Sequence, residues 1–255
     1  MVHRSFDLIG NIALVKFPYE FKGNRKKFAE KILKENKSVR TVLEKSGKFS
    51  GRLRKMQTSW LAGEKNKEVL YKENGCSFRF NIDTTYFSSR LSGERKELSE
   101  KIKKGEEVLV MFAGVGPFSI VIAKNSKAKK VYSNEINREA NKYAKLNLEL
   151  NKLKGKVEFL SGDIKKVDIK KKFDVIVMPR PRLKSSFLEQ AFKFSKKGTR
   201  IYYYDFCKSD EILLIVEKVK EEAKRFKKKI KILKTKSAGE IAPYKIRIRV
   251  DFKIL

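Results

Sequence analysis

The sequence predicts an α/β fold: a doubly wound, mostly parallel sheet with an antiparallel end, preceded by a small α+β domain. In Glu107–Ser119 an apolar run, a glycine turn and a helical pattern follow one another, as expected for a buried strand leading into a helix. A further short strand ends at Glu135, which repeats the strand–helix–strand order of a parallel sheet. In the tail, residues 230–235 and 244–252 form the pattern of an antiparallel hairpin. We therefore expect a ligand crevice at the carboxyl ends of the parallel strands.

The small domain is expected to span residues 1–83. Mixed strands around a single amphipathic helix indicate a compact α+β module. Its expected elements are a hairpin over 6–18 that turns at Gly10–Asn11, a helix over 22–36, and strands near 38–43, 68–72 and 76–81. Between them, the segment Lys48–Arg54 gathers basic side chains that continue into Lys55.

The larger domain is expected to span residues 84–255. It begins with a helix over 94–104, for which Ser92 is a plausible N-cap. The remaining elements alternate as strand and helix: strands at 108–112, 130–133, 157–160, 173–178 and 198–204, with helices from 119, over 134–151 and over 209–227. The closing hairpin is expected to turn through residues 237–243.

The composition indicates a polyanionic partner. Lysine and arginine number 62 against 30 aspartate and glutamate, a formal net charge of +32, which favours nucleic acid. A general lysine bias is an open alternative, because basic runs such as Lys165–Lys172 and Lys224–Ile230 are also ordinary solvated surface. No apolar run is long enough for a membrane span and no targeting segment is visible, so we expect a cytoplasmic protein.

The chain offers few residues for metal or histidine chemistry. Cys76 and Cys207 lie far apart without metal-ligand spacing, which predicts two buried thiols and neither a metal site nor a disulfide. The single histidine, His3, stands at a terminus that is expected to fray. Proton transfer is therefore expected from a carboxylate or from the substrate itself.

The glycine turn and the acid after the second strand together predict a nucleoside site. Gly114 and Gly116 let backbone N–H groups approach a ligand at the positive end of a helix. Glu135, nineteen positions after Gly116, is placed where an acid accepts hydrogen bonds from ribose hydroxyls. The alternative is plain α/β architecture, since glycine turns join strands to helices in many folds.

Other candidate residues stand at the ends of later strands. Asp163 follows the third strand, where an acid can bind an adenine amino group, although aspartate is also common at strand ends. The fourth strand runs into Pro179–Arg182, which is either part of the site or a stiff turn with solvated arginines. Tyr202 and Phe206 near the end of the fifth strand are candidates to stack on a base.

Phe112-Ala113-Gly114-Val115-Gly116-Pro117-Phe118-Ser119 closely resembles the cofactor loop of one family. This family comprises the archaeal and eukaryotic tRNA methyltransferases that act on guanosine 37, including relatives that build wyosine-type bases there. The resemblance implies a class I S-adenosylmethionine methyltransferase fold. It also implies that residues 112–116 hold S-adenosylmethionine, that Glu135 and Ile136 lie at its ribose, and that Asp163 lies at its adenine.

Residues 86–95 resemble the family's aromatic–arginine–acid–arginine signature. The match implies that Glu94 is the base for the guanine N1 proton and that Arg90 and Arg95 bind phosphate and base. It places Tyr86 beside the cofactor or the base, and Arg54 near the family's upstream catalytic arginine. The alternative for Glu94 is a first-turn acid that favours the helix dipole.

Two departures point to a particular branch of this family. The usual Asn–apolar–Pro motif after strand four, which contacts the target base, is Pro179-Arg180-Pro181 here, followed by Arg182 as a substrate-binding candidate. Val110 stands where the family normally has an acid. These features resemble the archaeal branch of wyosine synthesis, which methylates 4-demethylwyosine at carbon 7 and in some members also guanosine at N1.

The expected partner is therefore the anticodon loop of a tRNA, with tRNA-Phe as the expected species and a monomer as the expected state. The family usually carries a further N-terminal domain that contacts the tRNA body, and this sequence begins too late to contain it, so binding is expected to rest on the two domains present. Three alternatives stay open: an aminocarboxypropyl transferase of the same pathway, a non-catalytic RNA-binding protein, and a nicotinamide oxidoreductase, against which the closing hairpin counts.

Overall fold

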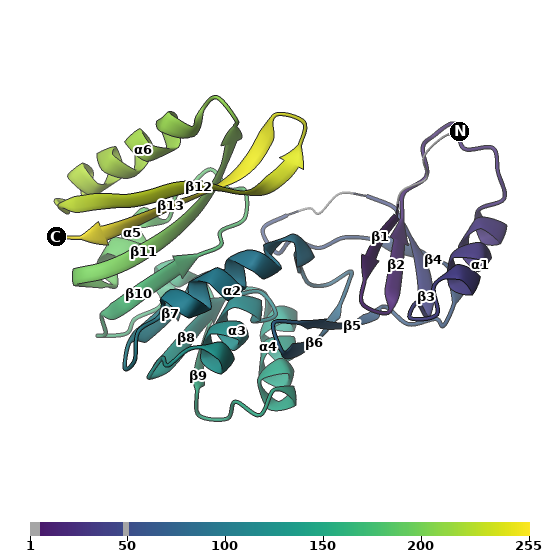
Figure 1. Ribbon diagram of the computed structural model, residues 1–255, viewed down its shortest axis with the longest axis horizontal. Helices are drawn as coiled ribbons and strands as arrows, with labels where there is room; N and C mark the ends of the chain where they lie inside the picture. The colour runs from purple at the N-terminus through teal and green to yellow at the C-terminus, as the bar shows by residue number, and fades with distance from the viewer. Residues whose placement is uncertain (1–5, 48–50) are drawn as a thin grey trace.

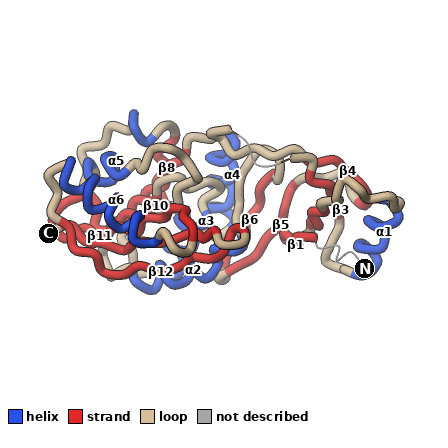
Figure 2. The backbone as a smooth tube through the Cα atoms, turned by 90° about the horizontal axis from the view of Figure 1, so that it is seen from above, coloured by secondary structure: helices blue, strands red, loops and turns tan. Residues whose placement is uncertain are grey.

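The computed structural model describes residues 6–47 and 51–255 of the chain and divides into a small body near the N-terminus and a larger α/β body (Figure 1). His3 and residues 48–50 of the predicted basic segment lie outside the described residues. A hairpin lies between the two bodies in both ribbon views (Figures 1 and 2).

The small body is a sheet covered by one helix. Its strands β1 (Phe6–Ile9), β2 (Ile12–Val15), β3 (Thr41–Lys45) and β4 (Thr58–Gly63) lie side by side in that order, and α1 (Arg25–Glu35) packs on β3 and β4. The predicted hairpin at Gly10–Asn11 is confirmed, and the third strand begins three residues later than expected. The sequence analysis missed β4, because Thr-Ser-Trp-Leu-Ala-Gly lacks a clean alternation of apolar and polar residues.

The hairpin between the bodies consists of β5 (Glu68–Glu73) and β6 (Cys76–Asn81). Two buried asparagines of α4 (Arg138–Leu150) and its C-cap complete the free edge of β6. Asn147 accepts the Arg79 N–H (2.7 Å) and donates to the Arg79 carbonyl (3.0 Å). Asn151 does the same with Ser77 (2.9 and 2.7 Å). The free edge of a strand leaves backbone N–H and carbonyl groups without partners. The two amides supply these partners to β6 in place of a neighbouring strand.

A third asparagine holds the other edge of the hairpin to the small body, which below is called the small domain. Asn11 accepts the Leu70 N–H (2.7 Å) and donates to the Glu68 carbonyl (3.2 Å). The turn lies so close to β5 that a Cβ on Gly10, whose φ is +59°, would stand 1.9 Å from the Leu70 carbonyl oxygen. Only glycine fits this position, and the approach fixes the small domain against the hairpin.

The larger body is built on a seven-stranded sheet in the order β12-β13-β11-β10-β7-β8-β9. Strands β7 (Glu107–Val110), β8 (Lys130–Glu135), β9 (Val157–Ser161), β10 (Phe173–Met178) and β11 (Ser195–Lys208) run parallel, and β13 (Lys245–Ile254) joins β11 and β12 (Ile230–Ala242) as antiparallel neighbours. This arrangement confirms the predicted doubly wound sheet with its antiparallel end.

Alternate residues of the central strands face two helical layers. Val108 and Val175 belong to a core with α2 (Ser92–Lys101), α3 (Pro117–Asn125) and α4, whereas Leu109 and Ile176 belong to a core with α5 (Leu188–Lys193) and α6 (Ile212–Arg225). Figure 1 shows α6 on one side of the sheet and α2 to α4 on the other. The chain moves outward in opposite directions from β7 and β10, which opens a crevice at their carboxyl ends.

Several predicted boundaries need correction. Ser92 is not an N-cap, because a 3₁₀ turn (η1, Ser89–Leu91) runs directly into α2 and Leu91 occupies the cap position without a side-chain bond. The helix after β8 begins at Arg138 with Asn137 as its cap, and α5 was not predicted. Residues 237–242 continue β12 through irregular pairing instead of forming a loop. Cys207 is half-buried, whereas Cys76 is buried as expected.

We predict that Asn147→Ala lowers the free energy of unfolding by about 2–4 kcal/mol, since it leaves the Arg79 N–H and the Arg79 and Val115 carbonyls without their bonds. Urea denaturation followed by circular dichroism measures this change. Lys145→Ala, on the exposed side of the same helix, is the control and should stay within about 0.5 kcal/mol of wild type. If Asn147→Ala lowered the free energy of unfolding as little as the control does, the hydrogen bonds of Asn147 would not be needed to hold the hairpin.

Candidate functional site

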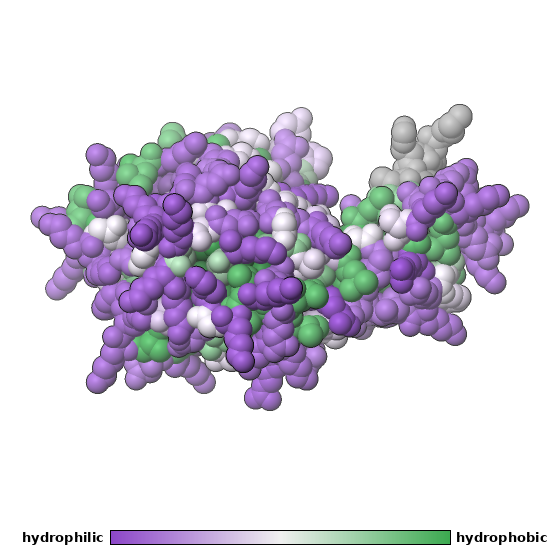
Figure 3. All heavy atoms as spheres, turned by 60° about the horizontal axis from the view of Figure 1, so that its bottom comes forward, coloured by the Kyte–Doolittle hydropathy of each residue, from purple (hydrophilic) through white to green (hydrophobic). Residues whose placement is uncertain are grey.

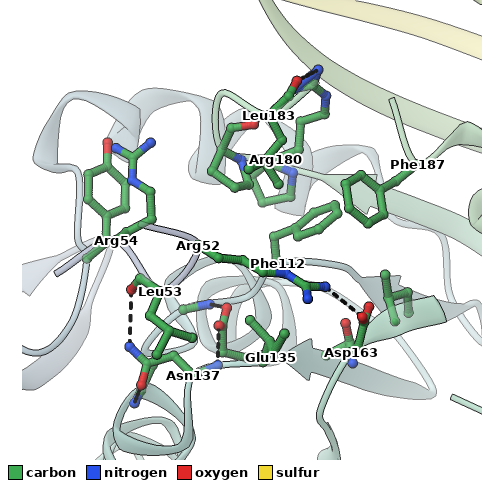
Figure 4. Close-up of a pocket in the computed structure, with 18 of the residues that line it drawn as sticks. Arg52, Leu53, Arg54, Phe112, Glu135, Asn137, Asp163, Arg180, Leu183 and Phe187 are labelled. Atoms are coloured by element: carbon green, nitrogen blue, oxygen red, sulfur yellow. Dashed lines mark hydrogen bonds and ion pairs between the residues drawn. The ribbon is translucent and has the colours of Figure 1, made fainter. Parts of the chain in front are cut away.

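A cavity of about 830 Å³, measured with its open mouth, lies at the carboxyl ends of the parallel strands (Figure 4). Its walls come from the loops after β7, β8, β9 and β10, from β13, and from residues 52–54 of the small domain. We call this cavity the main pocket.

The floor of the main pocket is the glycine turn after β7. Phe112, Gly114 and Gly116 all have positive φ angles (57°, 58° and 86°), and Gly116 is the N-cap of α3 with Pro117 at its first position. A Cβ on Gly114 would lie 3.3 Å from the Tyr86 carbonyl oxygen. The turn therefore brings backbone N–H groups close to the cavity at the positive end of a helix.

Glu135 at the end of β8 ties this turn to the start of α4. Its Oε2 accepts the Gly114 N–H (2.8 Å) and its Oε1 accepts the Asn137 N–H (2.7 Å). Burial raises the pKa of Glu135, while the N–H groups of Asn137, Gly114 and Ile136 act in the opposite direction. Each carboxylate oxygen can accept a further bond, so Glu135 fits the hydroxyls of a ribose.

Asp163 after β9 binds the small domain. Its Oδ2 accepts a hydrogen bond from Arg52 Nη2 (2.6 Å), and its Oδ1 accepts the Lys165 N–H (3.0 Å). Burial raises the pKa of Asp163, but the bonds and charges of Arg52 and Lys165 outweigh it and the net shift is downward. Leu53 adds a second link, since its carbonyl accepts a bond from Asn137 Nδ2 (3.3 Å). The segment from Gly51 to Arg54 thus forms one wall of the pocket, as Figure 4 shows.

Tyr86 stands at the rim of the pocket between two arginines. The Arg54 guanidinium lies 4.1 Å from the centre of the Tyr86 ring, and burial lowers its pKa. Burial raises the pKa of Tyr86, but the charges of Arg247 and Arg54 and the bonds from Arg247 and Ser88 outweigh it, so that its pKa is lowered. Arg247 was not among the predicted site residues. It stands in a strand of alternating basic and apolar residues, a pattern that does not distinguish it from its neighbours.

The loop Pro179-Arg180-Pro181 also lines the main pocket, but the Arg180 side chain points into the protein. Its guanidinium is 2% exposed and pairs with Asp205 Oδ1 (3.1 Å). It also donates to the Tyr203 hydroxyl (3.3 Å) and to the carbonyls of Pro181 (2.9 Å) and Leu183 (3.2 Å). The alternative of a solvated Arg180 is wrong, because this buried side chain fixes the loop from behind, and the predicted catalytic role of Arg180 stays a prediction.

Glu94, the predicted base, is buried in an ion-pair network outside the lining of the main pocket. Its carboxylate accepts bonds from Arg249 Nη1 (2.5 Å) and the Tyr204 hydroxyl (2.7 Å), and pairs with Lys236 Nζ (2.9 Å). Arg249 also binds Glu97, whose pKa is well below its usual range because of that bond. The structure therefore does not bring Glu94 to the cofactor site, and its catalytic role stays a prediction.

The other predicted residues fall into two groups, those that line the main pocket and those that do not. Arg95 is buried against Glu73 and donates to the Ser88 carbonyl (2.9 Å), so its guanidinium holds the hairpin and does not face the pocket. Arg90 is exposed and lines a neighbouring cavity, and Arg182 is exposed at a third. The residues brought together in the main pocket are Arg54, Tyr86, Phe112, Gly114, Glu135, Ile136, Asp163, Pro179, Arg180 and Pro181, whereas Ala113, Val115 and Gly116 lie behind its surface. Phe206 lines the pocket and Tyr202 is buried.

One face of the molecule is strongly polar. The face in Figure 3 is mostly hydrophilic, with smaller hydrophobic areas between the extending side chains. Within residues 6–47 and 51–255, no cluster of three or more His, Cys, Asp or Glu side chains is arranged to bind a metal ion. In the same ranges, no helix is both long enough and apolar enough to cross a membrane.

The sheet order, the glycine turn and the acid after β8 define a class I S-adenosylmethionine-dependent methyltransferase. Comparison with known families agrees: residues 69–233 match the TRM5/TYW2 methyltransferase domain, and residues 1–66 match the TYW2 N-terminal domain. The chain belongs to the TRM5/TYW2 methyltransferase family. This membership does not favour a nicotinamide oxidoreductase or a non-catalytic RNA-binding protein.

Similar proteins come from archaea and from eukaryotes. The tRNA (guanine(37)-N(1))-methyltransferase Trm5b of Pyrococcus abyssi is 37% identical over 98% of this chain and 74% of its own length, and its crystal structure superposes with a TM-score of 0.88, at 35% identity and the same coverage. The tRNA (guanine(37)-N(1))/4-demethylwyosine(37)-methyltransferase Taw22 of Nanoarchaeum equitans is 30% identical over 98% of this chain and its own full length. A complex of aTrm5 with tRNALeu has a TM-score of 0.85 at 31% identity, covering 98% of this chain and 72% of that one.

We predict that Glu135→Ala weakens S-adenosylmethionine binding by about 1–3 kcal/mol, because ribose hydroxyls lose a charged acceptor. Isothermal titration calorimetry measures the change, with Glu139→Ala as the control, since Glu139 is one turn further along α4 and half-exposed in a pair with Lys142. Equal affinities for both variants would make Glu135 a purely structural residue.

The raised pKa of Glu135 leads to a separate prediction on pH. A buried glutamate with a raised pKa takes up its proton at a higher pH than an exposed one, and the protonated form is the poorer acceptor. Affinity for S-adenosylmethionine should therefore fall as the pH is lowered through that pKa. Titrations repeated with Glu135→Gln should lose this dependence; an identical pH profile would assign the fall to another group.

Proposed function

We propose that this chain transfers a methyl group from S-adenosylmethionine to the base at position 37 of a tRNA. The target atom is carbon 7 of 4-demethylwyosine, N1 of guanosine, or both. The observation that carries the proposal is the main pocket itself, which shares Tyr86 and Arg247 with a second cavity in a chain of formal charge +32. The activities named for the Pyrococcus and Nanoarchaeum relatives support the same substrate position.

The proposed roles follow from the contacts in the main pocket. Gly114 lets the cofactor lie close to the backbone of the turn, Glu135 accepts bonds from the ribose, and Asp163 faces the adenine amino group. Two domains, residues 1–83 and 84–255, divide the work, with Arg52 and Arg54 of the first closing the cofactor pocket of the second. The proposal includes a cytoplasmic monomer that acts on tRNA-Phe.

The chemistry asked of the chain is modest. When bound, the cofactor supplies a methyl group that its sulfonium already activates. The residues of the pocket have to orient the base in line with that group and exclude water. Swinging the base out of the anticodon stack costs a few kcal/mol, which arginines on phosphate and aromatic stacking offset. Phe206 and Tyr86 are the aromatic side chains at the rim that are available for stacking.

The position of Glu94 bears on which base is methylated. Methylation at guanosine N1 requires a proton to leave that nitrogen, so a free carboxylate is a useful base. The Glu94 carboxylate is engaged by Arg249 and Lys236. It also lies outside the lining of the main pocket, so it is not placed beside a bound guanine N1. Methylation at carbon 7 is attack by an electron-rich carbon whose proton leaves only after the bond forms, and it needs less help. The network therefore favours the tricyclic substrate.

The loop after β10 supports the same choice. Proline at position 179 offers no side-chain amide to the edge of guanine, and the Arg180 guanidinium is held behind the loop by Asp205. Pro179 and Pro181 line the main pocket, and their rings restrict the backbone angles of the loop. A larger ring system has room there that a specific guanine contact would otherwise occupy.

The direct test is incubation with labelled S-adenosylmethionine and tRNA that carries either guanosine or 4-demethylwyosine at position 37. Mass spectrometry of the digested tRNA then identifies the modified nucleoside. A methyl group on either base supports the proposal, and an aminocarboxypropyl group would establish the alternative transferase. No modification of either tRNA under conditions where the cofactor binds would contradict it.

We predict that Glu94→Gln lowers activity on G37 by more than activity on 4-demethylwyosine-37, because a base contributes on the order of 10²–10⁴ to N1 proton removal. Pro179→Asn should shift the ratio toward G37 by restoring an amide at the guanine edge. Arg180→Ala should also shift the ratio, since it frees the loop that Asp205 holds. Single-turnover rates on both tRNAs measure each effect. Equal losses for Glu94→Gln together with an unmoved ratio for Pro179→Asn would refute this account of selectivity.

A further inference from the structure

The main pocket adjoins two further cavities, and the C-terminal hairpin forms part of both. The second cavity, about 1020 Å³ with its open mouth, lies between β1 of the small domain, residues 85–90 and residues 238–241 of β12. It shares Tyr86 and Arg247 with the main pocket. The third, about 520 Å³, shares Phe206 with the main pocket and Ile241 with the second. The three cavities are thus neighbours around the hairpin, and we call them together the trench.

Arg247 lines both the main pocket and the second cavity. It lies opposite Phe206 in the antiparallel pairing of β13 with β11, and its guanidinium is 5.1 Å from the centre of that ring. It also donates a hydrogen bond to Tyr86. The contacts on both sides restrict the side chain, so little rotamer entropy is lost when it binds a ligand. Arg247 is therefore held in place at the junction of the main pocket and the second cavity.

The charge of Arg247 is not neutralised by the protein. Within the part of the chain that the structure describes, no ion pair joins it to a carboxylate. Arg249, two residues along the same strand, pairs with Glu94, Glu97 and Asp251. Asp7 and Glu240 line the second cavity, but neither forms an ion pair with Arg247. The contrast indicates that Arg249 holds the fold together, whereas the guanidinium of Arg247 is available to an anion.

We propose that Arg247 is a positioning residue that binds a backbone phosphate of the target nucleotide. A guanidinium forms two parallel bonds with a phosphate, which fixes orientation as well as distance. A phosphate held at the junction leaves the base free to enter the main pocket while the flanking backbone follows the second and third cavities. Arg182, Lys208 and Lys245 line the third cavity and suit such a path. This inference rests on the proposed function.

The carboxylate of S-adenosylmethionine is a second anion that a guanidinium can bind. The phosphate is favoured because Arg247 lines the second cavity as well as the main pocket, and that cavity extends to the small domain, away from the glycine turn. A cofactor bound by Gly114 and Glu135 does not need a cation there, whereas a nucleotide that enters from the trench passes it. The experiment below separates the two sources.

The test compares Arg247→Met, Arg247→Lys and the control Lys253→Met, which removes the same charge from an exposed position further along β13. For each, tRNA affinity is measured over a range of salt concentrations, together with the affinity for S-adenosylhomocysteine and the single-turnover methylation rate. Arg247→Met should weaken tRNA binding about ten- to hundredfold and reduce the slope of log affinity against log salt by about one unit. Arg247→Lys should keep the slope and restore part of the affinity. Each Arg247 variant is judged against Lys253→Met, and affinity for S-adenosylhomocysteine should stay at the wild-type value.

The proposal would be overturned if Arg247→Met reduced the slope of log tRNA affinity against log salt by no more than Lys253→Met does. Loss of S-adenosylhomocysteine affinity with an unchanged salt slope would assign Arg247 to the cofactor instead and would also overturn it. If Arg247→Met fails to fold, the folded variant Arg247→Lys decides. Wild-type tRNA affinity in that variant would show that the guanidinium only packs, and would overturn the proposal. Failure of the proposed function is distinct, since the wild-type chain would then methylate neither tRNA.

Discussion

Three asparagine side chains determine how the two domains meet. Asn11 completes one edge of the β5–β6 hairpin from the small domain, and Asn147 and Asn151 complete the other edge from α4. Each amide both donates and accepts, so the hairpin has backbone partners on both sides without belonging to either sheet. Because Gly10 approaches β5 too closely for any side chain, the hairpin and the small domain are held in a single register.

This clamp has a direct effect on the cofactor site. With the small domain held against α4, its segment from Gly51 to Arg54 reaches the pocket, where Arg52 binds Asp163 and the Leu53 carbonyl binds Asn137. Asn137 in turn follows Glu135, whose carboxylate fixes the glycine turn. The cofactor pocket is therefore a property of both domains. The second cavity arises from the same contact, because its walls include the small domain and the C-terminal hairpin.

Local sequence patterns predicted the sheet, its antiparallel end and the Gly114–Glu135 pair, because buried strands, glycine turns and strand-end acids have strong local signals. They did not reveal β4 or Arg247, whose neighbours in sequence carry no distinctive pattern. Long-range contacts were equally hidden. Nothing in residues 89–95 shows that Glu94 meets Arg249 on a strand more than 150 positions later, or that Arg95 meets Glu73. Charged residues near a motif predict a site, but tertiary contacts decide which of them face it.

The central claim is that a target base reaches the cofactor through the junction formed by Tyr86, Arg247 and Phe206. A crystal structure of the chain with S-adenosylhomocysteine and an anticodon stem-loop tests it most directly. The account predicts the cofactor ribose on Glu135, base 37 in the main pocket beside the Pro179–Pro181 loop, and the adjoining phosphate on Arg247. An anticodon loop bound elsewhere on the surface, with base 37 outside the trench, would contradict it.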